Sequence, residues 1–140
     1  MAESDYPRSF WRRYAERHPQ TPKAHRFLGK DWNRVWGAGW AAHYDFKGVG
    51  FKVTVTQYLS KTGVVTYLSY EEGKEWSARL PSYKRAFKEA FNAKTDSDGR
   101  LCATRLVLPG GISNPDNWDL MIDWMEYHRQ EYERILRSQQ

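Results

Sequence analysis

The chain has 140 residues, of which 40% are hydrophobic and 16% aromatic, a length and composition typical of one globular domain. Its single cysteine, Cys102, excludes an intramolecular disulfide and a multi-cysteine zinc site. No apolar stretch approaches the ~20 residues of a membrane-spanning helix, and the N-terminus lacks the basic and apolar regions of a signal peptide. We therefore expect one cytoplasmic domain over residues 1–140, with an ordered core over about residues 6–136.

The net charge of the chain is +5, but the charge is distributed unevenly. Residues 1–34 carry eight basic against four acidic side chains, and residues 35–114 carry eleven against seven. Residues 115–140 have the opposite sign, with three basic against six acidic side chains. A basic domain of this kind favours a polyanionic partner such as nucleic acid, whereas the alternative interpretation is a solvated surface that keeps the protein soluble.

The first third of the chain predicts a helix and then an irregular segment. The helix runs from about Pro7 to Arg17, since proline suits an early helical position and the aromatic residues share one face. Those residues are Phe10, Trp11 and Tyr14. From Asp31 to Phe46 the pattern fits either a helix or a strand, so we expect irregular structure that passes into a strand near residues 40–46.

Three strands and two further helices follow. The alternation and β-branched content of Phe51 to Tyr58 and Val64 to Tyr70 predict a hairpin, and Arg100 to Leu108 predicts another strand. A helix is expected from Pro81 to about Asn92, and a long final helix from about Ser113–Asp116 to Leu136. This order predicts an α+β fold, in which an antiparallel sheet of about four strands carries an N-terminal, a middle and a long C-terminal helix.

The pattern resembles the bacterial and archaeal domain-of-unknown-function family 4268. The resemblance rests on the aromatic pair Phe10-Trp11, the hairpin from Phe51 to Tyr70, the segment Glu75 to Phe87, the strand from Arg100 to Leu108, and the last helix with Trp118 and Trp124. The resemblance implies a setting linked to nucleic acid and to defence against phage, because that domain often accompanies a restriction-type nuclease module. It implies no catalytic residues.

Two clusters of basic residues are the candidate nucleic-acid contacts. The first lies on the N-terminal helix and the second on the middle helix, where guanidinium and ammonium groups can meet phosphates. These residues are Arg12, Arg13, Arg17, Lys84, Arg85 and Lys88. The leading hypothesis is therefore a non-catalytic nucleic-acid-binding or accessory module that requires no cofactor.

Two other functions stay open. In a protein-interaction or self-assembly module, Leu120, Trp124 and Tyr127 would form an apolar patch, because they lie off the buried face of the last helix. In a small metal-dependent nuclease, Asp45 and Glu72 would hold Mg²⁺ while Lys74 positions the attacking water. The four histidines show no spacing typical of a metal site, so we expect no resident metal.

Overall fold

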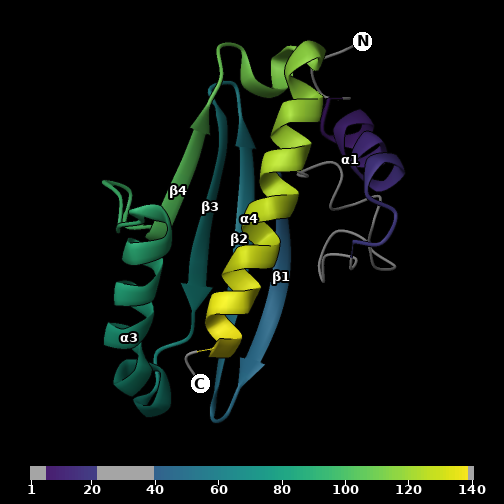
Figure 1. Ribbon diagram of the computed structural model, residues 1–140. Coiled ribbons are helices and arrows are strands. Elements are labelled where there is room, and N and C mark those ends of the chain that lie inside the picture. The colour runs from purple at the N-terminus through teal and green to yellow at the C-terminus, as the bar shows by residue number, and fades with distance from the viewer. Residues whose placement is uncertain (1–5, 22–39, 139–140) are drawn as a thin grey trace.

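The computed structural model describes residues 6–21 and 40–138 (Figure 1). The helices are α1 (Tyr6–Arg17), α3 (Lys74–Phe91) and α4 (Trp118–Ser138), and two short 3₁₀ turns are η2 (Gly111–Ser113) and η3 (Pro115–Asn117). The strands are β1 (Ala41–Gly48), β2 (Phe51–Ser60), β3 (Gly63–Tyr70) and β4 (Leu101–Val107). The predicted α+β fold with an antiparallel sheet is confirmed. The ambiguous segment before residue 40 lies outside the described residues.

The four strands form one antiparallel sheet in the order β1-β2-β3-β4. Tyr44, Val55 and Leu68 occupy one row across β1, β2 and β3, and all three are buried. Side chains on a strand alternate between the two faces, so this row identifies the face that meets the helices. On the opposite face Thr54 and Thr56 are also buried.

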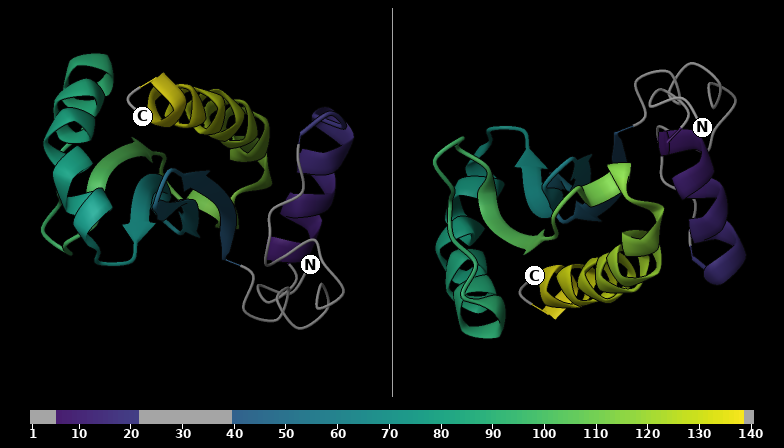
Figure 2. Two further views of the ribbon diagram at one scale, coloured as in Figure 1. Left: turned by 90° about the horizontal axis from the view of Figure 1, so that it is seen from below. Right: turned by 90° about the horizontal axis from the view of Figure 1, so that it is seen from above.

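The long helix α4 covers the sheet, and α1 and α3 lie on opposite sides of it (Figures 1 and 2). Two buried hydrogen bonds fix α4 to the strands. The Gln57 side-chain amide donates to the Met125 carbonyl oxygen at 2.8 Å, and the Tyr132 hydroxyl donates to the Cys102 carbonyl oxygen at 2.6 Å. The apolar residues of α4 that are buried comprise Trp118, Met121, Ile122, Met125, Tyr132, Ile135 and Leu136.

The middle helix begins earlier than expected. We predicted a start at Pro81, but α3 begins at Lys74 and contains Pro81 in its interior. Proline lacks the N–H that would reach the carbonyl four residues back, a loss that water can compensate because Pro81 is exposed. Trp76 precedes Pro81 in the helix and Tyr83 follows it, and their buried rings stack with centroids 5.6 Å apart. The free energy gained from this packing therefore exceeds the cost of a proline inside the helix.

The last helix also differs at its start. Asn114 accepts a hydrogen bond from the Asp116 amide, as expected of a capping residue, and Pro115 follows it. The first turn is the 3₁₀ segment η3, however, and the α-helix proper begins only at Trp118. Tight 3₁₀ turns are common at helix ends. None of the helices described by the structure has the length and apolarity that crossing a bilayer requires.

An irregularity in β4 and a short bridge shape the edge of the sheet. Thr66 pairs with Thr104 but Leu68 pairs with Leu101, so β4 contains an extra residue, and Cys102 has a positive φ of 51°. Beyond the bulge, the Ala103 amide donates to the Lys94 carbonyl oxygen at 2.9 Å. The segment that follows α3 therefore covers the outer edge of β4 at Ala103.

Substitution of Gly111 by alanine should severely destabilise the fold. Gly111 has a φ of +47°, and an added Cβ would overlap the Ser60 carbonyl oxygen and the Gly63 amide nitrogen in the β2–β3 turn. We expect Gly111→Ala to lower the free energy of unfolding by about 3 kcal/mol or more, measured by urea denaturation. Gly99→Ala is the matched control, since φ there is +79° but the added Cβ meets no atom within 4 Å. Its expected cost is only about 1 kcal/mol, and equal losses in the two variants would contradict the steric argument.

Candidate functional site

The basic residues of α1 are joined to the acidic residues of α4. Arg13 donates to both carboxylate oxygens of Asp119, at 2.8 and 2.9 Å. Arg17 does the same to Asp123, at 2.7 and 2.6 Å, and His18 Nε2 lies 2.8 Å from that carboxylate. The two helices are therefore connected by a row of ion pairs along their shared side.

These contacts also change the acidity of the two carboxyl groups. Hydrogen bonds from Arg17 and His18 lower the pKa of Asp123 to about 2, and the Arg13 guanidinium lowers the pKa of Asp119. Arg13 and Arg17 are thus matched by anions of the protein itself. Of the three predicted phosphate contacts on α1, only the exposed Arg12 has no ion pair among the described residues.

The basic residues of α3 have a different environment. Lys84, Arg85 and Lys88 are exposed and form no ion pair with any residue that the structure describes, and the same holds for Lys74. Successive helical residues are about 100° apart, so these four side chains fall within about one third of the circumference. We call them the α3 basic stripe. The helix carries five basic and two acidic residues in all.

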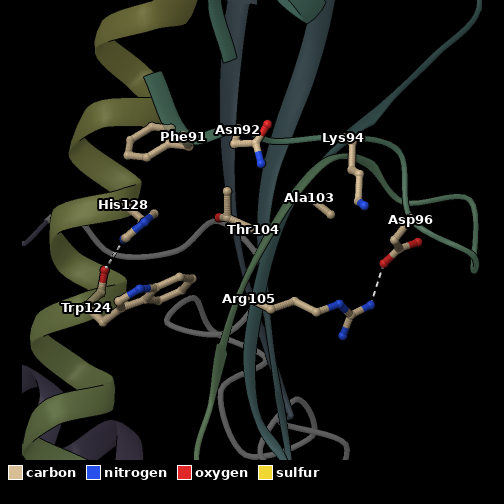
Figure 3. A pocket seen from close by; sticks show the side chains of 9 residues that line it. All are labelled: Phe91, Asn92, Lys94, Asp96, Ala103, Thr104, Arg105, Trp124 and His128. Carbon is tan, nitrogen blue, oxygen red and sulfur yellow. Dashed lines mark hydrogen bonds and ion pairs between the residues drawn. The ribbon is translucent and has the colours of Figure 1, made fainter. Parts of the chain in front are cut away.

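A pocket of about 320 Å³ opens beside the C-terminal end of α3 (Figure 3). We call it the α3–α4 pocket, because residues of both helices line it together with β4 and the segment between α3 and β4. Its lining residues are Phe91, Asn92, Lys94, Asp96, Ala103, Thr104, Arg105, Trp124 and His128. Helix α4 contributes an aromatic wall, and the other side is polar and charged.

Aromatic rings form a ladder along the α4 side of the pocket. The Trp124 and His128 rings stack with their centroids 3.8 Å apart and their planes at 23°. His128 in turn lies 4.9 Å from Phe91, which stacks on Tyr132 at 5.7 Å. Trp124 is half-buried and is the last ring of this series among the described residues, so the ladder ends at the pocket.

Two hydrogen bonds determine the polar character of the aromatic wall. His128 Nδ1 lies 2.8 Å from the Trp124 carbonyl oxygen, and burial lowers the pKa of His128, so the ring is neutral at pH 7 with its proton on Nδ1. The Nε2 atom is then an acceptor. The Tyr132 hydroxyl donates its proton to the Cys102 carbonyl oxygen, so in its contact with Thr104 at 3.0 Å the Thr104 hydroxyl is the donor. The Thr104 oxygen can still accept a hydrogen bond from another group.

The two cations that line the pocket, Arg105 and Lys94, differ in whether they can bind an anionic ligand. Arg105 is bound to Asp96, whose carboxylate also accepts the amides of Asp98 and Arg100 at 2.9 Å. Burial opposes ionisation of Asp96, but these donors hold its pKa below the ordinary value. Lys94 has no ion pair among the residues described. It is therefore the cation of the pocket that is free to meet an anion.

The predicted partner-binding residues do not form one uniform patch. Leu120 and Tyr127 are 56% and 57% exposed on the outer side of α4. Trp124 instead turns into the pocket and stacks on His128. Tyr127 meets the edge of Phe91 at 6.5 Å. The outer surface thus offers two apolar side chains, with the third facing the pocket.

The three residues of the nuclease hypothesis lie in different surroundings. Asp45 accepts a hydrogen bond from Thr54 at 2.7 Å and lies 3.6 Å from the Lys52 ammonium group, beside a second pocket of about 290 Å³. Glu72 is exposed before α3, and Lys74 is the first residue of that helix. Neither lines the second pocket. Within residues 6–21 and 40–138 no cluster of three metal-ligating side chains occurs.

Comparison of the chain with models of known protein families, with curated proteins and with solved structures finds no match. The resemblance to the domain-of-unknown-function family 4268 therefore stays a prediction.

Sequence reasoning identified Trp124 but missed the other residues of the pocket. The four-residue spacing of Trp124 and His128 is a signal that was available, because such a pair lies on one side of a helix. Lys94, Thr104 and Arg105 gave no comparable signal. They reach the pocket only because the chain turns back after α3 and pairs with β4.

Acidification should weaken the connection between α1 and α4. The pKa of Asp123 lies below its unfolded value of 3.8, so its ion pairs stabilise the fold above that pH and are lost as the pH falls toward about 2. We expect Asp123→Asn to lower the melting temperature at pH 7 but to have a much smaller effect at pH 2, where about half of the Asp123 carboxyl groups of the folded protein are protonated, in a thermal denaturation series. Glu89→Gln, at an exposed position of α3, is the control. A difference between Asp123→Asn and wild type that persists unchanged at pH 2 would contradict the assigned ion pairs.

Proposed function

We propose that this protein is a non-catalytic nucleic-acid-binding or accessory module whose α3 basic stripe contacts phosphates. The observation that carries the proposal is the set of neighbouring exposed cations at Lys84, Arg85 and Lys88, which lack carboxylate partners among the described residues. The cations of α1 contribute less, because Arg13 and Arg17 already bind carboxylates.

The physical basis is the release of counterions from the polyanion. Each phosphate that a lysine or arginine neutralises frees condensed salt ions, which makes the affinity fall with rising salt. A guanidinium that is already bidentate with a carboxylate would have to break that pair first, whereas the α3 side chains are hydrated and free to reorganise. This difference favours α3 over α1 as the contact surface.

The biological setting rests on the resemblance to the domain-of-unknown-function family 4268. That family often occurs with restriction-type nuclease modules, so an accessory role in phage defence is consistent with a surface that holds nucleic acid without cutting it. A cytoplasmic location would accord with such a role.

Removal of the α3 charges should weaken binding and reduce its salt dependence. We expect Lys84→Gln/Arg85→Gln/Lys88→Gln to lower the affinity for a labelled single strand at low salt. The slope of log affinity against log salt concentration should decrease in magnitude by about 2, because three phosphate contacts are lost. Fluorescence anisotropy across a salt series measures both quantities.

The control for this experiment removes the same number of positive charges elsewhere. Lys47→Gln/Arg134→Gln/Arg137→Gln changes exposed residues that do not belong to the α3 basic stripe, and Arg134 and Arg137 pair with Glu131 and Glu133. If both triple variants lose affinity equally, net charge alone governs the interaction and α3 is not its site. If the wild-type protein binds no nucleic acid, the proposed function fails.

A second candidate function is a protein interface on the outer surface of α4. The exposure of Leu120 and Tyr127 favours it, because large apolar side chains on a solvent-facing helix are typical anchors for a partner or for a second copy.

Self-association through this surface should depend on concentration. We expect Leu120→Ser/Tyr127→Ser to abolish any dimer that light scattering detects for the wild-type protein at high concentration, with only a small decrease in melting temperature, since more than half of each side chain is exposed. A mass that stays monomeric at every concentration would exclude self-assembly through α4, and a dimer that survives the double substitution would place the interface elsewhere.

A further inference from the structure

The α3 basic stripe leads directly to the α3–α4 pocket. Lys88 lies one turn before Asn92, whose amide donates to the Lys88 carbonyl oxygen at 2.8 Å, and Asn92 lines the pocket. Lys84 faces the same side of the helix, because it lies four residues before Lys88 in α3. Lys94, which like these lysines forms no ion pair within the described part of the chain, lies on the polar side of the pocket. A polyanion that follows the stripe thus arrives at an aromatic cavity.

The ladder of rings ends at this cavity. His128 covers one face of Trp124, and no other ring of the described residues stacks on the opposite face. A flat aromatic group can therefore extend the series by one more ring. Other residues that line the pocket can form hydrogen bonds: Thr104 Oγ1 as an acceptor, and the Asn92 side-chain amide as donor and acceptor.

We propose that the α3–α4 pocket receives one unpaired base of a single-stranded nucleic acid, which stacks on Trp124 while the neighbouring phosphates contact Lys88 and Lys94. The inference rests on the proposed function and specifies its substrate as single-stranded. A base in a duplex has both faces covered and its edge paired, so it cannot enter the pocket without being extruded.

Size and charge both suit this occupant. The volume of about 320 Å³ lies at the small end of the range for ligand pockets, which fits a single planar group better than a long chain. The neutral His128 ring adds no positive charge inside the pocket, so the phosphates are attracted to its lysine-bearing rim while the uncharged base enters. Combinations of a basic groove and stacking aromatic rings are typical of proteins that bind single strands.

The test compares three labelled probes on the wild-type protein: a mixed-sequence single strand of about 12 nucleotides, the same strand as a duplex, and an abasic strand of equal length. The abasic strand keeps its phosphates and loses its bases. We expect the normal strand to bind at least about fivefold more tightly than the abasic strand, since stacking of one base on an aromatic side chain typically contributes that much. The duplex should bind more weakly than the normal strand as well.

Substitutions at Trp124 then assign the effect to the pocket. Trp124→Leu should reduce the affinity for the normal strand to that for the abasic strand, whereas Trp124→Phe should retain most of the difference because it keeps a stacking face. Lys84→Gln/Arg85→Gln/Lys88→Gln should weaken binding of both strands by a similar factor. Melting temperatures of all variants verify folding, and the comparison of probes on the wild-type protein requires no substitution.

Several results would overturn the inference. If all three probes bind the wild-type protein equally and the α3 triple variant weakens all of them, the base pocket is excluded while the proposed phosphate contacts stand. If Trp124→Leu preserves the preference for the normal strand over the abasic strand, the base binds at another place. If none of the probes binds, both the inference and the proposed function fail.

Discussion

The packing of α4 across the sheet is the interaction on which the rest of the structure depends. Its buried face carries Met121, Met125 and Leu136 onto the strands, and the hydrogen bond from Gln57 to the Met125 carbonyl oxygen fixes its position along them. Because a helix has a fixed angular spacing, seating this face on the sheet determines where every other side chain of α4 points. The acidic residues Asp119 and Asp123 then face α1, while Trp124 and His128 lie toward α3 and β4.

This arrangement explains part of the uneven charge distribution along the sequence. The basic N-terminal segment and the acidic C-terminal segment are far apart in the chain, but α1 and α4 bring them together as ion pairs. The network continues inward, where the buried Glu126 accepts hydrogen bonds from Tyr14, Thr21 and Arg129. Two of the N-terminal cations, Arg13 and Arg17, therefore contribute to positioning α1. The cations of α3 have no such partners among the described residues, which is why the functional argument moves to that helix.

The sequence contained enough information for the fold, although several boundaries were wrong. Strand alternation identified β2 and β3, and the long helical spacing identified α4, because both patterns record which side chains are buried. The start of α3 was missed because Pro81 is a strong local signal, and the favourable packing of Trp76 and Tyr83 across it involves tertiary contacts that a local pattern does not contain.

The candidate site was less predictable than the fold, for a related reason. Exposure of Lys84, Arg85 and Lys88 follows from the helical pattern, but whether they form ion pairs depends on which elements pack nearby, and they form none with the described residues. Arg13 and Arg17 are also basic residues on the polar side of a helix, but in the folded protein they form ion pairs with Asp119 and Asp123. The pocket combines residues of α3, β4 and α4 that no single stretch of the chain brings together.

The bridge between Lys94 and Ala103 has a consequence for how the protein behaves in solution. An edge strand offers unpaired amides and carbonyls to any other extended chain, and long open edges promote sheet-to-sheet polymerisation. Here the chain itself occupies the first part of the β4 edge, the bulge at Cys102 distorts it, and Pro109 follows soon after the strand. From Thr104 to Val107 the outer edge of β4 pairs with no strand among residues 6–21 and 40–138, and the charged Arg105 lies within this stretch. On the β4 side, the sheet is thus protected against growth into fibrils by the same turn of the chain that forms the polar side of the pocket.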